Sequence, residues 1–249
     1  MSANQRIDLN CDVGELSGPD GRAADKALLA LVSSANVACG GHAGDPASMA
    51  ATMLAAAALG VAVGAHPSYA DREYFGRRSR AQSPHDAAAA ISAQLAVLRD
   101  IARAHDLALT HVKPHGALYN DAAADPSIAV AVAEAVASFD RALVLVGLAG
   151  SPLLDAGRAA GLRVAAEGFC DRAYEPDGTL RSRALPAAVF DDPEIAALQA
   201  VRLAQLGGID TLCIHGDTPD ALPIARAVRA ALHDASISIA KLYSEENLT

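Results

Sequence analysis

The sequence has no tryptophan, and only 4% of its 249 residues are aromatic. It also lacks any cluster of Lys and Arg with interleaved aromatic residues, and its formal net charge is −9. A protein that binds nucleic acid needs a basic face that displaces counterions from phosphates. The composition therefore excludes nucleic acid as a partner, and an anionic substrate would need basic residues placed locally.

The four cysteines are scattered singly, without a CxxC pair, which indicates no disulfide framework. The first residues, MSANQRIDLNCDVGE, lack the charged and then apolar pattern of a secretory signal. We therefore expect a protein of the reducing cytoplasm.

A long Leu-rich hydrophobic run is also missing. The longest apolar stretch, residues 49–66, is rich in Ala and is interrupted by Thr52, Gly60 and Gly64. A membrane span requires about 20 predominantly apolar residues. We therefore expect a helix followed by a strand here, and no association with a membrane.

What the sequence does have is a repeated helix-start signal. A Ser, Thr or Asp followed by Pro places an N-cap before a proline at the first helical position, where the missing N–H costs nothing. The pattern occurs at Asp45-Pro46, Ser83-Pro84, Asp125-Pro126, Ser151-Pro152, Asp192-Pro193 and Thr218-Pro219. Each pair is predicted to open a helix, and an earlier Ala- and Leu-rich helix is predicted near residues 22–33.

A short β-rich run precedes each predicted helix, at residues 6–14, 34–40, 60–66, 107–115, 142–147, 162–169 and 211–216. Alternating strands and helices indicate parallel strands joined by right-handed crossovers. Seven or eight such units favour a single TIM-like (β/α) barrel domain over residues 1–249, of the kind found in glycoside hydrolases and deacetylases. Residues 236–243 would supply an irregular eighth strand, and residues 166–190 form a long loop of the kind that is usually functional.

Polar residues gather where the predicted strands end, which is where barrels of this kind carry their sites. Alternation puts Asp8, Asn10 and Asp12 on one strand face, and it does the same for His111, Lys113 and His115. Other strands end at or before Asn36, His42, His66, Glu167 and His215. A single strand-end histidine is usually structural, but so many ionisable groups at corresponding ends favour one shared site.

The remaining ionisable groups have simpler interpretations. His85, His105 and His233 fall on or near helices and are predicted to be surface residues. Three carboxylates that precede prolines are helix caps, at Asp45, Asp125 and Asp192.

Seven motifs make the chain resemble the LamB/YcsF family, the A subunits of bacterial ATP-dependent 5-oxoprolinases. They are IDLNCDVGE, SANVACGGHAGDP, VGAHPSY, FGRR, HVKPHGALYN, DRAYEPDGTLRSR and HGDTP, which run in the family's order over essentially the whole chain. The chain departs from the family pattern at Gly41, where an aromatic is usual, and at Glu15-Leu16-Ser17.

The resemblance implies conversion of 5-oxoproline (pyroglutamate) to L-glutamate with hydrolysis of ATP, in a complex with subunits B and C. Neither a GxxxxGK[ST] loop nor a kinase-like glycine loop is present, so the partners are expected to share or supply the ATP-handling surface. ATP would be a co-substrate, with Mg²⁺ held through the partner subunits. No metal site is assigned to this chain in that interpretation.

The candidate residues receive hypothetical roles in opening the lactam. Asp12 would activate water, while Lys113 and Arg172 would neutralise the substrate carboxylate or a phosphate. Four histidines would orient water or donate a proton to the ring nitrogen, and four further residues would position the substrate or provide a second carboxylate. The histidines are His42, His66, His115 and His215, and the further residues are Asn10, Asn36, Tyr119 and Glu167.

Two other interpretations remain open from the sequence. In a metal-dependent deacetylase or amidohydrolase acting without ATP, Asp12, His42 and His66 would bind the metal. Alternatively, the chain would be a non-catalytic scaffold for its partner subunits, although a scaffold has no need of so many ionisable groups at strand ends.

Overall fold

The computed structural model describes residues 5–79, 82–218 and 220–242. Its strands are β1 (Arg6–Val13), β2 (Ser34–Ala38), β3 (Ala62–His66), β4 (His111–Val112), β5 (Val144–Leu148), β6 (Arg163–Phe169), β7 (Thr211–Ile214) and β8 (Ser238–Ile239). Its helices are α1 (Gly18–Leu29), α2 (Pro46–Ala58), the 3-10 turn η1 (Arg72–Tyr74), α3 (Pro84–Ala104), α4 (Gly116–Ala124), α5 (Pro126–Phe139), α6 (Pro152–Ala159), α7 (Pro193–Leu206) and α8 (Ala221–Asp234).

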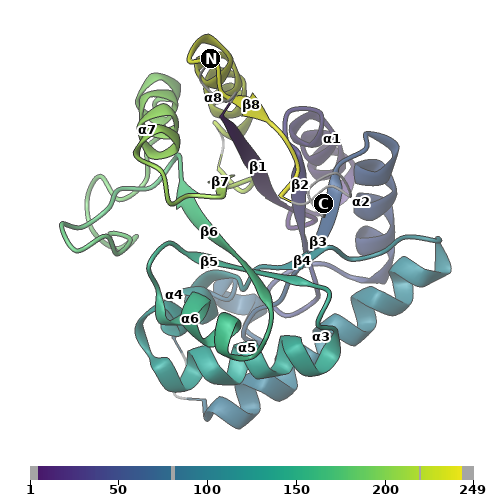
Figure 1. Ribbon diagram of the computed structural model, residues 1–249. Coiled ribbons are helices and arrows are strands. Elements are labelled where there is room, and N and C mark those ends of the chain that lie inside the picture. The colour runs from purple at the N-terminus through teal and green to yellow at the C-terminus, as the bar shows by residue number, and fades with distance from the viewer. Residues whose placement is uncertain (1–4, 80–81, 219, 243–249) are drawn as a thin grey trace.

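The first seven strands form a closed parallel barrel, surrounded by the helices that connect them (Figure 1). Strands β1 to β7 pair in chain order, and β1 also pairs with β7, which closes the ring. β8 lies outside the ring and pairs with β1 beside Arg6 and Ile7. The predicted barrel is therefore confirmed, with seven strands in the ring and a two-residue eighth strand added at one edge.

Five of the six proline-marked helices begin at the predicted residue, which confirms the N-cap interpretation. In α2, α5 and α7 the cap carboxylates of Asp45, Asp125 and Asp192 accept backbone N–H groups of the first turn. The exception is α8, because it begins at Ala221 with Asp220 at the N-cap. This helix was predicted to start at Thr218-Pro219, and Pro219 lies outside the described residues.

The first helix was predicted too late in the chain. α1 begins at Gly18 rather than near Arg22, because Ser17 takes the N-cap position and Pro19 fits the first turn. It ends at Leu29, before the predicted end at residue 33, and β2 begins at Ser34.

The strand predicted over residues 107–115 is only two residues long. Pro114 has no N–H to donate to a strand ladder. The backbone nevertheless continues alongside β3, since the N–H of Lys113 donates to Ala65 O (3.0 Å) and that of His115 donates to Pro67 O (2.8 Å). The chain then turns into α4, a helix that the sequence did not predict and that carries Tyr119.

The barrel interior is largely polar, which is unusual for a fold whose interior is normally filled by branched apolar side chains. Strand β1 shows the reason, because its Ile7, Leu9 and Cys11 face the apolar core under the helices. Its Asp8, Asn10 and Asp12 point inward and are almost completely buried. Apolar side chains line the inside of the barrel at Val144, Val146 and Ala165, and nearer the carboxyl ends of the strands at Leu148 and Phe169.

Among the described residues, no single helix has the length and apolar composition of a membrane span. The bent pair of α4 and α5, whose axes turn by 117° at the break, meets the criterion only when the two are taken together.

Candidate active site

The centre of the site is an ion pair between Asp12, near the end of β1, and Lys113, just beyond β4. The Lys113 Nζ lies 2.9 Å from Asp12 Oδ1 and 2.8 Å from Glu167 Oε1, and all three side chains are at most 4% exposed. Burial alone would raise the pKa of Asp12, but His66 and Lys113 hold it well below its usual value. Burial alone would lower the pKa of Lys113, but the surrounding anionic groups, chiefly Asp12, raise it well above the usual range.

Two asparagines inside the barrel, Asn10 and Asn36, hold this ion pair in place with hydrogen bonds. Asn36 Nδ2 donates to Asp12 Oδ1 (2.8 Å) and to Asn10 Oδ1 (2.8 Å), and the latter oxygen also accepts from Lys113 Nζ (3.2 Å). His111 Nε2 lies 2.9 Å from Asn36 Oδ1, so the imidazole completes the amide's hydrogen bonds. Burial lowers the pKa of His111 to about 3, which keeps the ring neutral. His111 is therefore a structural residue of the barrel interior.

Glu167 and Tyr119 lie beside the lysine and retain unused hydrogen-bonding capacity. Glu167 Oε1 binds Lys113, and Asn10 Nδ2 donates to the same oxygen (3.1 Å). Glu167 Oε2 and the Tyr119 hydroxyl are both buried, and the two side chains interact with one another but have no other partner for these atoms among the described residues. Burial and the neighbouring Glu167 raise the pKa of the Tyr119 hydroxyl well above its usual value. The phenol therefore stays a hydrogen-bond donor.

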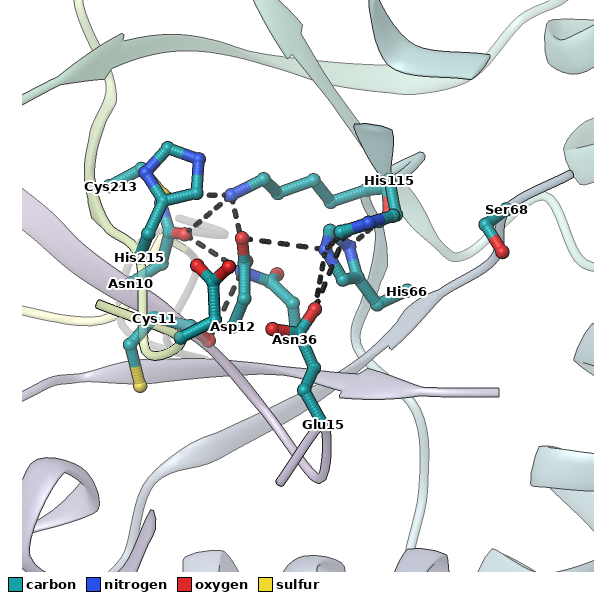
Figure 2. A network of polar contacts seen from close by, with 12 residues as sticks. Asn10, Cys11, Asp12, Glu15, Asn36, His66, Ser68, His115, Cys213 and His215 are labelled. Carbon is teal, nitrogen blue, oxygen red and sulfur yellow. Dashed lines mark hydrogen bonds and ion pairs between the residues drawn. The ribbon is translucent and has the colours of Figure 1, made fainter. Parts of the chain in front are cut away.

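His66, His115 and Glu15 form a compact cluster on the other side of Asp12. Figure 2 shows Asp12 between His215 on one side and His66 and His115 on the other, with Glu15 reaching toward the two histidines from the loop after β1. His66 Nε2 lies 3.4 Å from Asp12 Oδ2 and 3.0 Å from His115 Nδ1. Glu15 Oε1 lies 3.4 Å from His115 Nδ1 and 3.9 Å from His66 Nε2.

His42 packs behind this cluster. Its ring stacks on that of His115, with centroids 3.7 Å apart and planes at 6°, and its Nε2 lies 2.9 Å from Glu15 Oε1. Burial lowers the pKa of His42 to about 2 and that of His115 well below its usual value. Burial, together with the nearby Asp12, raises the pKa of Glu15 well above its usual value.

His215 belongs to a separate carboxylate–imidazole pair. Its Nδ1 lies 2.9 Å from Asp171 Oδ1, and its backbone N–H donates to Asp171 Oδ2 (3.0 Å). Burial alone would raise the pKa of Asp171, but His215 holds it below its usual value. The His215 ring also stacks on that of Phe169, with centroids 5.4 Å apart, so Asp171 and Phe169 together fix its orientation. His215 Nε2 is therefore the nitrogen available to a ligand.

These groups border a cavity of about 470 Å³ at the carboxyl ends of the strands, a size typical of small-molecule sites. Its lining includes Asp12, His66, Lys113, His115, Tyr119 and His215 together with the guanidinium groups of Arg77, Arg172, Arg181 and Arg183. The cavity can therefore accommodate an anionic ligand despite the net negative charge of the chain.

The arginines differ in how much of their hydrogen-bonding capacity is already used. Arg172 donates to the carbonyls of Ala188 (3.2 Å) and Arg181 (2.6 Å), and burial lowers its pKa to about 10. Arg77 pairs with Asp217. Among the described residues, no hydrogen bond or ion pair involves the guanidinium of Arg183. Arg183 is therefore the cation that is most available to a ligand.

The structure brings the predicted site residues together around one mouth. Asp12, His66, Lys113, His115, Tyr119, Arg172 and His215 line the cavity, while Asn10, Asn36 and Glu167 lie beneath it in the barrel and His42 lies behind the histidine cluster. The predicted loop over residues 166–190 also contributes, since Arg172 and residues 180–184 lie at the cavity wall.

Four residues of the site were missed from the sequence: Glu15, Asp171, Arg183 and Cys213. Only Cys213 had a usable signal, because it lies two residues before His215 and therefore shares its strand face. Its Sγ lies 2.9 Å from Lys113 Nζ. The other three lie in loops, where spacing does not reveal which way a side chain points.

The chain was compared with protein families, with curated proteins and with solved structures. A model of the LamB/YcsF family matches residues 7–247. The chain is 49% identical over 248 residues to the 5-oxoprolinase A subunit of Methylococcus capsulatus, which covers 95% of each chain. It is also similar to the lactam utilization protein of Thermus thermophilus, with 42% identity, a TM-score of 0.85 and coverage of 95% of this chain and 99% of that one.

The likeness to deacetylases is confined to the fold. The catalytic domain of a peptidoglycan N-acetylglucosamine deacetylase from Eubacterium rectale aligns with a TM-score of 0.57 over 98% of this chain and 91% of its own, at 12% identity. Such similarity supports the barrel architecture but carries no information on the reaction.

Proposed function

The chain belongs to the LamB/YcsF family, and on that basis we propose that it is the A subunit of an ATP-dependent 5-oxoprolinase. The reaction opens the lactam of 5-oxoproline to L-glutamate and is coupled to hydrolysis of ATP to ADP and phosphate. One observation carries the proposal beyond the names of its relatives. The ionised Asp12 lies at the edge of a cavity whose other walls carry imidazole and guanidinium groups.

Asp12 is the group that activates water in this proposal. Its Oδ1 is held by Lys113 and Asn36, whereas Oδ2 is directed toward His66 beside the cavity. A fixed carboxylate that stays ionised accepts a proton from water as the water oxygen adds to the lactam carbon. Because Lys113 is committed to Asp12 and Glu167, its contribution is to keep the Asp12 carboxylate charged.

His215 is the proton donor to the ring nitrogen. Both ring nitrogens of His42, His66 and His115 lie against other protein atoms. Within the described part of the chain, His215 uses only Nδ1, toward Asp171. Because Nδ1–H donates to Asp171, the step requires the doubly protonated ring: as the C–N bond of the lactam breaks, the imidazolium gives its Nε2 proton to the nitrogen, which becomes the amino group of glutamate, and the ring is left neutral.

Arg183 is the anchor for the carboxylate of 5-oxoproline, since its guanidinium lines the cavity and suits that group. Tyr119 lines the cavity beside Glu167 and is placed to donate a hydrogen bond to the substrate. Arg172 supports the site by holding the long loop between β6 and α7 through its backbone carbonyls.

The ATP-dependent step is assigned to the assembled enzyme. The sequence contains no GxxxxGK[ST] motif, so we propose that subunits B and C supply most of the ATP and Mg²⁺ site. A lactam is an unreactive amide, and phosphorylation of its carbonyl oxygen by ATP activates the carbon toward water. Addition of water with cleavage of the C–N bond then gives an acyl phosphate, which a second water hydrolyses to glutamate and phosphate. The proposal includes a reducing cytoplasm, since all four cysteines are buried free thiols.

The test is reconstitution of the enzyme from purified subunits. Release of glutamate and ADP from 5-oxoproline and ATP is measured with this chain alone and with added subunits B and C. We expect activity only in the mixture, and a loss of at least about 100-fold with Asp12→Asn. Amide hydrolysis by this chain alone without ATP would instead support a deacetylase-type enzyme, and full activity of the Asp12→Asn complex would support a scaffold.

A further inference from the structure

His66 and His115 present two lone pairs to one another. His66 Nδ1 lies 2.7 Å from the carbonyl oxygen of Lys113, and His115 Nε2 lies 2.9 Å from that of Phe75. A carbonyl can only accept, so each of these nitrogens carries the ring proton. The other two nitrogens, His66 Nε2 and His115 Nδ1, then have no proton in the neutral rings, and they face each other at 3.0 Å. Such a pair is unfavourable unless a proton or a metal ion lies between or beside the nitrogens.

The Glu15 carboxylate completes a set of three donor atoms. Its Oε1 lies 3.4 Å from His115 Nδ1 and 3.9 Å from His66 Nε2. A tetrahedral ion with ligands at ~2.1 Å separates neighbouring donor atoms by ~3.4 Å. The three observed separations, from 3.0 to 3.9 Å, bracket that value. Without rearrangement of the backbone, the three donors can therefore surround one ion.

The groups behind these donors are those that orient metal ligands. A ligating histidine usually donates its other N–H to a carbonyl or carboxylate, as His66 and His115 do here. His42 has the corresponding role for the carboxylate, because its Nε2 lies 2.9 Å from Glu15 Oε1 while Ser68 Oγ contacts its Nδ1 at 3.0 Å. His42 cannot itself complete the set, since its ring is parallel to that of His115 and their in-plane lone pairs do not converge.

The charge of the buried groups supports a cation independently of the distances. The carboxyl groups of Asp12, Glu15 and Glu167 are at most 4% exposed, and the only ammonium among them is that of Lys113. Lys113 pairs with Asp12 and Glu167, and burial raises the pKa of Glu15, so the Glu15 carboxyl is ionised here only if a cation lies beside it. Buried charges need compensation, and a divalent cation provides it.

We propose that His66 Nε2, His115 Nδ1 and Glu15 Oε1 bind a divalent first-row transition metal ion such as Zn²⁺ or Mn²⁺. Two imidazoles and a carboxylate suit these ions better than Mg²⁺ or Ca²⁺, which prefer oxygen ligands. His66 and His115 line the cavity, so the fourth position of the ion opens toward the ligand space. Asp12 Oδ2, 3.4 Å from His66 Nε2, borders that position.

The consequence for catalysis rests on the proposed function. A metal ion at this place polarises the lactam carbonyl or lowers the pKa of a bound water, and Asp12 accepts the proton that the water releases. Metal binding itself does not depend on that reaction, so the two are tested separately.

The experiment is a binding measurement on the full chain without partner subunits. Metal content is measured by mass spectrometry after purification, and Zn²⁺ and Mn²⁺ are each titrated into chelator-treated protein. We expect one equivalent per chain, with affinity reduced at least about 100-fold in Glu15→Gln and His115→Asn. His42→Asn should lose about 10-fold, whereas the surface variant His233→Asn should bind as the wild type does.

Cobalt substitution separates this site from a second group of donors, Asp12, Cys213 and His215, that also lie close together. At the proposed site Co²⁺ gives d–d bands without a thiolate charge-transfer band. A charge-transfer band that disappears in Cys213→Ser would overturn the assignment, as would sub-stoichiometric binding of both metals to the wild type. Equal affinity in the wild type and in a folded Glu15→Gln variant, with folding checked by circular dichroism, would also refute it.

Discussion

The ammonium of Lys113 and the carboxylate of Asp12 lie 2.9 Å apart inside the barrel, although 101 residues separate them in the sequence. Neither side chain is more than 4% exposed. An ion pair at this depth contributes little net stability, because desolvation offsets most of the attraction. Its value is functional, since it holds an ionised carboxylate at the edge of the cavity.

Replacing Lys113 by Met should destabilise the protein by about 3–5 kcal/mol, because Asp12 and Glu167 lose their common buried partner. Urea unfolding measures the effect. The double variant Lys113→Met/Asp12→Asn should recover part of the loss, whereas the control Lys26→Met, outside the barrel interior, should change stability by less than about 0.5 kcal/mol. Additive effects of the two buried substitutions would show that the pair is not coupled.

Replacing Arg183 by Gln should raise the KM for 5-oxoproline about 10- to 100-fold in the reconstituted enzyme and change kcat much less. The reason is that a carboxylate anchor contributes equally to the bound substrate and to the transition state. Arg181→Gln is the matched control. That guanidinium also lines the cavity but is engaged by Pro186 O at 3.1 Å and by Glu175 at 3.5 Å. Equal KM changes in the two variants would contradict the assignment of Arg183 as the carboxylate anchor.

Asp8 should make the protein less stable as the pH rises from about 4 to about 6. Burial raises its pKa from 3.8 to about 6, despite hydrogen bonds from Ser33, Ser34 and Thr211. The folded state therefore binds a proton that the unfolded state has released over this range, and stability falls until the folded-state pKa is passed. In Asp8→Asn this contribution, about 3 kcal/mol, is absent. Unfolding midpoints at a series of pH values test it, and parallel curves for the two proteins would contradict it.

Gly64 should tolerate no side chain, because a Cβ there would overlap the imidazole of His111 on the neighbouring strand. Gly64→Ala is expected to cost at least about 1–3 kcal/mol of stability, as overpacking of a filled interior does. Gly147→Ala on β5 is the control, since its Cβ would meet the flexible Leu153 Cδ2 at 3.0 Å. Thermal unfolding of both variants decides the matter, and the prediction fails if their stabilities are equal.

Much of the architecture follows from local signals. The Ser-Pro and Asp-Pro pairs opened five helices at the predicted residue, because an N-cap and a proline act within one turn of chain. Alternation along β1 correctly separated the inward Asp8, Asn10 and Asp12 from the outward Ile7 and Leu9. The short β4 and the unexpected α4 were missed because Pro114 and Gly116 redirect a segment whose composition resembles a strand.

The sequence by itself determined the alternation of strands and helices, the polar inner face of the barrel and the family to which the chain belongs. These depend on periodicities and motifs that are written into neighbouring residues. Only the tertiary structure decided which polar groups meet. It brought Glu15 to His66 and His115, paired Asp171 with His215, and showed that Arg172 is engaged where Arg183 is not. Loop side chains have no periodicity, so their direction is set by contacts between segments far apart in the chain.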